Sequence, residues 1–204
     1  MQEANSVWGR SYASLRFGLG NTVANELLFS PNVTGGYYAY PVYGTERAYN
    51  IPKFYEHFVQ ETINANIGDP YNTIPLFTAE EALLNRAEAY LRINNAPSAI
   101  SDLNAFASRN IDNYDPAKHN VTAAKAVDFY GQSAGTSLLL AILDFKRTFF
   151  LHEGMRWFDI LRLKIPVTHE TVGGSRITLS SNDPRRVLQL PVLTRQAGLE
   201  PNPR

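Results

Sequence analysis

The chain has 204 residues, of which 44% are hydrophobic and 19% charged, and its 19 basic and 19 acidic residues give a formal net charge of zero. This length and apolar content suit one domain or one large part of a larger domain. Because there is no basic surplus, the composition argues against nucleic-acid binding and against a polybasic membrane patch. Since the chain has no cysteine, disulfides, cysteine metal sites, a cysteine nucleophile and lipid anchors on cysteine are excluded within it.

No apolar run approaches the roughly 20 residues that a membrane-spanning helix requires. The N-terminal sequence MQEANSVWGR has no basic region followed by an apolar one, so it does not resemble a signal peptide. We therefore expect either a cytoplasmic protein or a chain that begins within a longer protein. The motifs at the other end of the chain, described below, favour the longer protein.

Residues 1–77 predict a loop-rich segment, because glycines and prolines interrupt each candidate element. The pattern allows short extended pieces near Val33 and over residues 37–43, and it predicts one short helix from about Lys53 to Asn66. We expect this segment to dock on a more regular scaffold.

Residues 78–204 predict a helical region that begins with two helices. Thr78 and Glu81 form a capping box before the sequence AEEALLNRAEAYLR, whose apolar residues recur at helical spacing. Pro97 suits the first turn of a second helix, and the short connection predicts an antiparallel hairpin of the tetratricopeptide type. Because one such unit cannot bury its apolar face alone, partner helices are expected elsewhere.

Two more helices are predicted downstream. Residues 110–135 indicate a loop with a short strand or helix, and a third helix is expected from about Ser137 to His152. The sequence MRWFDILRLK predicts a further helix that ends before Pro166, with Trp157 in the core. Residues 167–204 are expected to be extended, with a turn at Gly173 and Gly174. The predicted fold class is mainly α, a tetratricopeptide-like hairpin scaffold with long irregular insertions and little β structure.

Residues 131–135 match G-x-S-x-G, the nucleophile elbow of serine hydrolases, with Ser133 as the nucleophile. Asp144 or Asp159 together with His169 would complete a triad. The elbow requires a preceding strand and several βα units, whereas the hydrophobic runs before it indicate helices or loop. We therefore predict that the protein is not an enzyme, and keep a Ser133 hydrolase as an alternative. The four histidines lack ligand spacing, so neither a metal nor a cofactor is predicted.

A cluster of charged residues lies around residue 155. Its members are Arg147, Glu153, Arg156, Asp159 and Arg162. Neighbouring guanidinium groups favour the charged form of a carboxyl group, which makes it a poor general acid. We interpret the cluster as a structural ion network.

Three segments together resemble the C-terminal part of SusD/RagB proteins. Their order and spacing fit the whole of residues 78–204, and the second segment is the most specific. The segments are RAEAY at 86–90 with Leu103, Asn104 and Arg109 of the next helix; Lys146 and Arg147 followed by EGMRWFDILR at 153–162; and LPV at 190–192 with GLEPNP at 198–203.

The chain departs from the family at Phe145 and Phe149, since the equivalent positions in relatives are often acidic. Packing should therefore replace part of the usual ion network. Family members are also longer, so the resemblance implies that an N-terminal part with the signal peptide and the lipidated cysteine is missing. We expect any membrane attachment to depend on that lipid anchor.

The resemblance implies a non-catalytic protein on the outer face of a Bacteroidetes-type outer membrane. Its partner would be a TonB-dependent SusC-type transporter, over which it acts as a lid during nutrient uptake. The ligand would be an oligosaccharide or polysaccharide, or in some relatives a peptide. A pure protein-interaction scaffold without a small-molecule ligand is a further alternative.

A glycan-binding surface needs exposed aromatic rings and a few hydrogen-bonding groups. No family binding residue can be transferred by position, so the candidates come from the tyrosine-rich loops of residues 8–55, where exposure is expected. The opposing interpretation is that these rings pack on the scaffold. The candidates are Trp8, Tyr37, Tyr38, Tyr40 and Tyr43 for stacking, with Asn32 and Arg47 as polar partners.

Overall fold

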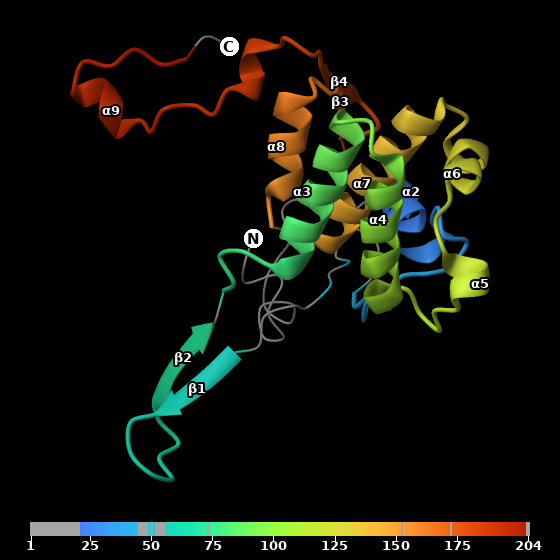
Figure 1. The fold of residues 1–204 in the computed structure, drawn as a ribbon. Helices are drawn as coiled ribbons and strands as arrows, with labels where there is room; N and C mark the ends of the chain where they lie inside the picture. Colours follow the sequence, from blue (N-terminus) through green and yellow to red (C-terminus); the bar gives the residue numbers. More distant parts are fainter. Residues whose placement is uncertain are drawn as a thin grey trace. The chain divides into compact units, whose positions relative to one another are not determined.

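The computed structural model describes residues 21–44, 49, 51, 56–72, 74–151, 153–171 and 173–202. Of the described residues, 48% are helical and 11% lie in strands, which confirms the mainly helical class predicted from the sequence. The chain divides after Glu153 into two compact units, residues 1–153 and 154–204 (Figure 1). The predicted boundary between residues 77 and 78 falls inside the first unit.

The first unit contains a helix hairpin. α3 spans Ala79–Arg92 and α4 spans Ala96–Asn110. The Thr78 hydroxyl accepts the Glu81 N–H at 3.2 Å, as the capping box predicts, and the Asn95 side chain accepts the Ser98 N–H at 3.2 Å. Both helices therefore begin at a side-chain cap, and a three-residue connection links them.

An ion pair joins the two helices of the hairpin. Arg86 donates through Nε and Nη2 to the two carboxylate oxygens of Asp102, at 2.9 and 2.7 Å. The Asp102 side chain is only 7% exposed. A bidentate pair of this kind fixes orientation as well as distance, so it holds α3 and α4 in one register.

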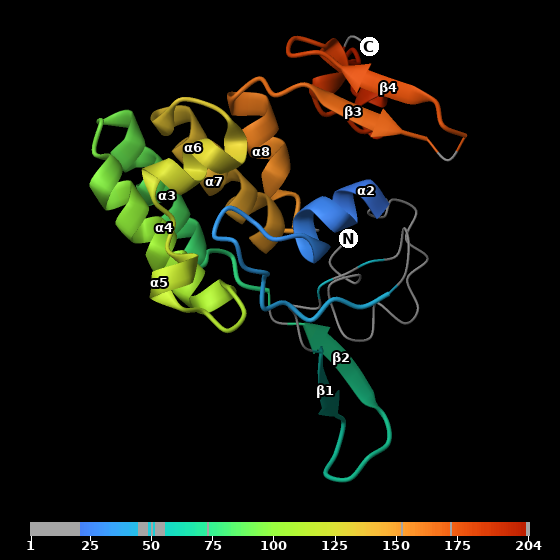
Figure 2. The same ribbon diagram turned by 90° about the vertical axis from the view of Figure 1, so that its right-hand side faces the viewer.

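α7 (Ala134–Phe149) packs against both helices of the hairpin, and the views in Figures 1 and 2 agree on this arrangement. It starts and ends three residues before the predicted helix. The main core is formed where α3, α4, α6 and α7 meet, and a large apolar area is buried there. Its buried members are Val33, Leu84, Ala87, Leu103, Phe106, Val121, Ala126, Leu138, Ala141, Ile142 and Phe145.

Residues 110–135 contain more helix than the sequence predicted. α5 spans Pro116–His119 and α6 spans Ala123–Tyr130. Each begins at a side-chain cap, Asp115 and Thr122 respectively, and the Ala117 N–H bond lowers the pKa of Asp115. Gly131 ends α6 with a φ of 65°, a left-handed conformation that glycine adopts without steric cost.

The helix predicted over residues 53–66 is wrong for the part of it that is described. β1 (Glu56–Gln60) instead pairs antiparallel with β2 (Gly68–Asn72), in a register that places Phe58 opposite Pro70. A short apolar run fits a helical and an extended pattern about equally well, so pairing with a second segment decides between them.

A shorter helical segment precedes the hairpin, formed by α2 (Asn21–Ala24) and the π-helical turn η2 (Asn25–Phe29). It contributes to a second, smaller apolar cluster. The buried members of this cluster are Leu27, Leu28, Ile51 and Leu151.

Residues 32–36 form a tight turn that a half-buried lysine ties to the helices. Lys125 Nζ, on α6, donates to the carbonyl oxygens of Thr34 at 2.8 Å and Asn120 at 3.3 Å, and also to that of Lys118. At Gly36 an added Cβ would lie 2.7 Å from Cγ2 of Ile111. The turn therefore fits closely against the residue that follows α4 and is tied to the first turn of α6.

Replacing Lys125 by methionine should lower the free energy of unfolding by about 1–3 kcal/mol, because three carbonyl groups lose their donor. Urea denaturation followed by circular dichroism would measure the change. Lys118→Met is the matched control, since the Lys118 side chain is 75% exposed, and it should leave the midpoint nearly unchanged. Equal effects from the two substitutions would contradict this role for Lys125.

The second unit contains α8 (Met155–Arg162), a hairpin of β3 (Val167–Glu170) and β4 (Arg176–Leu179), the turn η3 (Pro184–Arg186) and α9 (Leu193–Gln196). The strands pair from Val167 opposite Leu179 to Glu170 opposite Arg176. The predicted turn near Gly174 closes this hairpin, with a Gly174 φ of 79°. In the part of the chain that the structure describes, no helix is long and apolar enough to span a bilayer.

A buried arginine connects these elements. The Arg186 guanidinium donates to the carbonyl oxygens of Ile160 at 2.5 Å, Ile165 at 2.8 Å and Ser180 at 3.0 Å. Arg186 is 4% exposed. One side chain thus joins the last turn of α8, the segment before β3 and the segment after β4.

The tail is closed by two side-chain amides. Gln189 Nε2 donates to the Asn202 carbonyl oxygen at 3.0 Å, and the Asn202 N–H donates to Gln189 Oε1 at 2.8 Å. Asn202 Nδ2 also donates to the Leu188 carbonyl oxygen at 2.7 Å. Residues 190–201 therefore form a loop whose two ends are held together.

Substituting Arg186 by methionine should loosen the β3–β4 hairpin, because three carbonyl groups lose the donor that joins them. We expect amide hydrogen exchange in β3 and β4 to accelerate by about tenfold or more. Arg185→Met serves as the control, because the Arg185 side chain is 44% exposed and pairs with Asp183. Unchanged protection in the Arg186 variant would show that the guanidinium does not organise this unit.

Candidate functional site

Residues 37–43 form an extended segment with two different faces. Along it, positions 37, 39, 41 and 43 are exposed, whereas positions 38, 40 and 42 are partly buried. A period of two is the pattern of an extended strand, in which successive side chains point to opposite sides. The segment therefore has one face toward the scaffold and one face toward solvent.

Backbone hydrogen bonds fix this segment to the end of α4. The Ala39 N–H donates to the Asn110 carbonyl oxygen at 2.9 Å, and the Asp112 N–H donates to the Tyr37 carbonyl oxygen at 2.9 Å. Tyr38 and Ile111 form an antiparallel bridge between these two bonds. The extended conformation is thus held by pairing, as in a β-ladder.

The scaffold face of the segment is aromatic. The Tyr38 and Tyr40 rings stack on each other with centroids 5.4 Å apart and an interplanar angle of 7°. Phe145 contacts Tyr38 edge-on at 6.2 Å, and Phe149 contacts Tyr40 edge-on at 6.3 Å. Phe106 stacks on Phe145 at 4.8 Å and continues the contact into α4. These stacked and edge-to-face arrangements are the preferred ones for aromatic pairs.

Asn110 adds a polar anchor beneath the aromatic rings. Its Oδ1 accepts the Tyr40 hydroxyl at 3.0 Å, and its Nδ2 donates to the Phe106 carbonyl oxygen at 3.0 Å. Burial raises the pKa of Tyr40 and of Tyr38, so both phenols keep their protons. The Tyr40 hydroxyl therefore remains a hydrogen-bond donor at any physiological pH.

The solvent face carries two partly exposed tyrosines. The Tyr37 side chain is 50% exposed and that of Tyr43 is 43% exposed. Within this segment, Ala39 and Pro41 lie between them on the same face, and both have short side chains. This arrangement can present apolar aromatic area to the C–H face of a sugar.

The other predicted ligand-binding residues lie in different environments. The Tyr38 and Tyr40 rings pack on the scaffold, which leaves Tyr37 and Tyr43 as the stacking candidates. The Asn32 side chain accepts the Thr34 N–H at 2.9 Å and the Thr34 hydroxyl at 2.6 Å, so its carboxamide oxygen shapes the turn before the segment. Trp8 and Arg47 lie outside the described residues.

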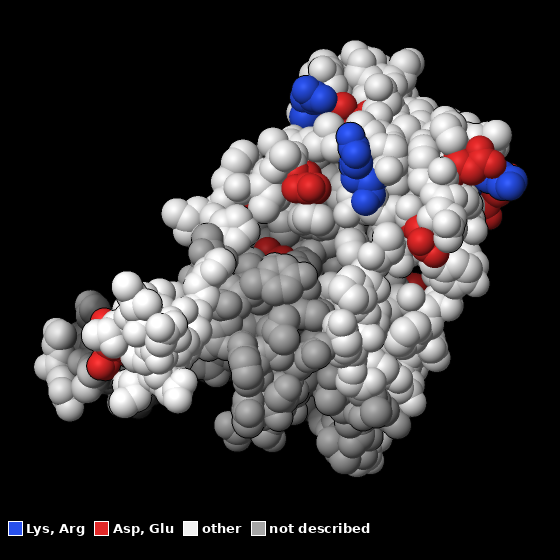
Figure 3. Space-filling view, turned by 90° about the horizontal axis from the view of Figure 1, so that it is seen from below, with Lys and Arg blue, Asp and Glu red and all other residues white. Residues whose placement is uncertain are grey.

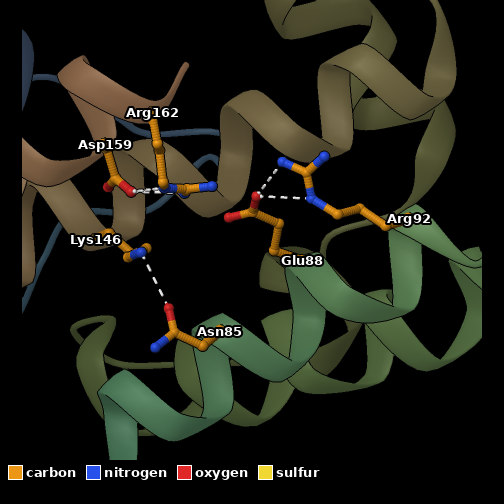
Figure 4. A network of polar contacts seen from close by, with 6 residues as sticks. All are labelled: Asn85, Glu88, Arg92, Lys146, Asp159 and Arg162. Carbon is orange, nitrogen blue, oxygen red and sulfur yellow. Dashed lines mark hydrogen bonds and ion pairs between the residues drawn. The ribbon is translucent and has the colours of Figure 1, made fainter.

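Charged residues of the predicted ion network form pairs within each unit. In the first unit, Arg147 pairs with Glu26 at 2.9 Å, a partner that the sequence did not suggest. In the second unit, Arg162 pairs with Asp159 at 2.6 Å within α8 (Figure 4), and the Asp159 side chain is 4% exposed. Glu153 and Arg156 are both half-buried.

A polar cluster that the sequence analysis missed lies where α3 meets α7 (Figure 4). Lys146, which is 8% exposed, donates through Nζ to Asn85 Oδ1 at 3.1 Å. Glu88, 6% exposed, pairs with Arg92 at 2.7 Å one helical turn further along α3. The sequence spacing of Asn85, Glu88 and Arg92 places them on one helical face, and this spacing could have indicated the cluster.

A shallow hollow of about 210 Å³ adjoins this cluster. It is lined by Glu88, Leu91, Arg92, Gly135, Thr136 and Leu139. It mixes one ion pair with leucine side chains, and it is small for a ligand pocket. On the face shown in Figure 3 the acidic and basic side chains of the described residues are scattered, without a large patch of one sign.

Ser133 does not lie in a nucleophile elbow. The preceding VDFY sequence forms the end of α6, and the G-x-S-x-G sequence connects α6 to α7. The Ser133 hydroxyl donates to the Thr136 hydroxyl oxygen at 3.0 Å at the start of α7. The strand that the elbow requires is replaced by a helix. Across the described residues, no group of three or more histidine, aspartate or glutamate side chains is arranged to hold a metal ion.

Comparison of the chain with protein-family models gives no match. Comparisons with curated proteins and with solved structures likewise find no similar protein. The function proposed below therefore rests on the residues of this chain and on the resemblance of its motifs.

The anchor beneath the aromatic rings can be tested by removing one hydroxyl group. Tyr40→Phe should lower the free energy of unfolding by about 1–2 kcal/mol, because Asn110 Oδ1 loses its buried donor. Tyr37→Phe makes the same chemical change at an exposed position and should leave stability nearly unchanged. Urea denaturation of both variants measures the difference, and a stability loss only in Tyr37→Phe would contradict the assigned faces.

Proposed function

We propose that this chain is the C-terminal portion of a SusD/RagB-type protein that binds glycans without chemically altering them. In this proposal the protein acts at the outer face of the outer membrane and delivers its ligand to a TonB-dependent SusC-type transporter. The observation that carries the proposal is the pair of exposed rings, Tyr37 and Tyr43, on a segment held firmly by the scaffold.

A fixed aromatic surface suits the binding of sugars. Sugar rings offer apolar C–H faces that stack on aromatic side chains, while their hydroxyl groups remain hydrogen-bonded to water or to polar residues. Because residues 37–40 are already held by α4 and α7, binding requires little ordering of this part of the segment, which reduces its entropic cost.

The positions that resemble SusD/RagB proteins have structural tasks in this chain. In the first motif, Arg86 forms the ion pair with Asp102. In the second, Gly154 takes a φ of 80° just before α8, and Asp159 and Arg162 pair within that helix. In the tail, Asn202 holds the closing loop through Gln189. Structural roles of this kind are expected of residues that define a fold. They support a tetratricopeptide-like arrangement of the α3–α4 hairpin with α7.

The two departures from the family support the placement of the ligand surface. Phe145 and Phe149 stand where relatives often carry acidic residues, and these two rings contact Tyr38 and Tyr40. Acidic side chains at these positions would lack such ring contacts. We propose that this divergent member uses the aromatic contacts to fix a tyrosine-bearing strand on its helices.

Affinity electrophoresis of the full chain through gels containing different polysaccharides tests the proposal. We expect retardation by at least one glycan, and weaker retardation of Tyr37→Ala and Tyr43→Ala, since each loses a stacking ring. Tyr71→Ala is the matched control, because Tyr71 is 56% exposed on β2 and lies outside the proposed surface.

Circular dichroism should show unchanged helix content in all three variants. Retardation that is insensitive to Tyr37 and Tyr43 would remove these residues from the site and leave glycan binding standing. The absence of retardation by every polysaccharide would contradict the proposed function of this chain and favour a protein-interaction scaffold.

A further inference from the structure

The hairpin of β1 and β2 is a sheet of two strands. Within the described part of the chain these strands pair only with each other, so each has an outer edge (Figure 1). We infer that the outer edge of β1 accepts an extended segment of a partner protein as a third strand, in which apolar residues alternate with lysine or arginine. The hairpin is separate from residues 37–43, so the inference goes beyond the proposed function and does not depend on it.

The hydrogen bonds between the strands decide which backbone groups face outward. The Glu61 N–H donates to the Ile67 carbonyl oxygen at 3.1 Å, where the chain turns from β1 to β2. Glu61 and Ile67 continue the strand register, and hydrogen-bonded pairs alternate with non-hydrogen-bonded pairs along an antiparallel ladder. Three positions further along the ladder, Phe58 and Pro70 therefore form a non-hydrogen-bonded pair. The backbone N–H and carbonyl groups of Phe58 thus point away from β2.

The close contact at Gly68 agrees with this alternation. An added Cβ at Gly68 would lie 2.2 Å from the carbonyl oxygen of Val59, which therefore faces β2. Because successive residues of a strand direct their backbone groups to opposite edges, those of Phe58 and Gln60 face the open side. The outer edge of β1 thus presents backbone donors and acceptors to an added strand.

Pro70 makes the outer edge of β2 unsuitable for a further strand. Its nitrogen carries no hydrogen, and the register places it where this edge would need a donor. The strand β1 (Glu56–Gln60) contains no proline, so its outer edge keeps a donor at each outward position. Since a sheet of two strands is marginally stable, a third strand is expected to add beside β1.

The two faces of the hairpin set the side-chain pattern of the added strand. Opposite residues of an antiparallel ladder share a face, so Phe58 and Pro70 lie on one face, and Val59, Glu61 and Asp69 lie on the other. All five side chains are exposed. A residue that forms backbone hydrogen bonds with Phe58 places its side chain on the apolar face, and its two neighbours lie on the face that carries the carboxylates. The added strand should therefore alternate.

The charge of the hairpin selects a basic partner. Residues 54–85 contain no lysine or arginine, and no ion pair joins Glu61 or Asp69 to another described residue. The two carboxylates are diagonal neighbours on one face, where like charges repel. A lysine or arginine beside Glu61 offsets this repulsion. A second copy of the chain would instead bring more carboxylates to the same edge, so a basic strand of another protein fits better.

Fluorescence anisotropy of the full chain with a labelled peptide, Lys-Val-Lys-Val-Lys-Val-Lys, tests the inference. The peptide is capped at both ends, as a segment within a protein is. We expect it to bind on the order of tenfold tighter than the same peptide with glutamate in place of lysine. N-methylation of its valines should abolish binding, because their N–H groups face β1, whereas N-methylation of its lysines should not.

Substitutions in the hairpin give a second test. Phe58→Pro removes an outward N–H that β1 does not use for pairing with β2, and it should weaken peptide binding about tenfold. Glu61→Gln should weaken it severalfold. Glu200→Gln is the matched control, because it makes the same chemical change at an exposed residue outside the hairpin, and it should bind the peptide as the unchanged chain does.

Four results would overturn the inference. Equal binding of the two N-methylated peptides would exclude strand addition, in a test that leaves the protein itself unchanged. Equal binding of the glutamate peptide would exclude a basic partner, and a requirement for an uncapped terminus would assign the edge to free peptides. Sedimentation equilibrium that shows a dimer, lost in Phe58→Pro, would assign the edge to a second copy. None of these results bears on retardation by polysaccharides.

Discussion

The first unit depends on the way one buried amide, Asn110, is satisfied at the end of α4. Its carbonyl oxygen accepts the Ala39 N–H, its Oδ1 accepts the Tyr40 hydroxyl, and its Nδ2 donates to the Phe106 carbonyl oxygen. A buried polar group without partners is costly, so these bonds are mutually required. Together they bring a loop segment and a helix end into one rigid surface, from which Tyr37 and Tyr43 face solvent.

Aromatic packing and polar anchoring act together at this place. Phe145 and Phe149 provide edge-on contacts to the inner tyrosine rings, which a charged side chain could not provide. Hydrophobic contact alone has little directional preference, whereas the Tyr40 hydroxyl bond fixes the position of its ring. The segment that carries the candidate ligand surface is therefore held by contacts on its scaffold face.

The second unit is held together by polar contacts and not by a buried apolar core. None of its described residues is a buried hydrophobic one, and its organising side chain is Arg186, which donates to three backbone carbonyls. The Gln189–Asn202 contact closes its tail in the same manner, with amide groups standing in for backbone pairing. Polar side chains that satisfy irregular backbone can thus hold a small unit that has little apolar core.

The sequence alone determined the elements whose signals are local. Helical periodicity predicted α3, α4, α7 and α8 to within a few residues, and a capping box predicted the start of α3, because these signals are local in the sequence. Only the three-dimensional structure decided the strand at Glu56–Gln60, which forms by pairing with a second segment. It also decided which tyrosines of the cluster face the helices and which face solvent. Four tyrosines between residues 37 and 43 look alike in sequence, and contact with Asn110, Phe145 and Phe149 buries two and leaves Tyr37 and Tyr43 exposed.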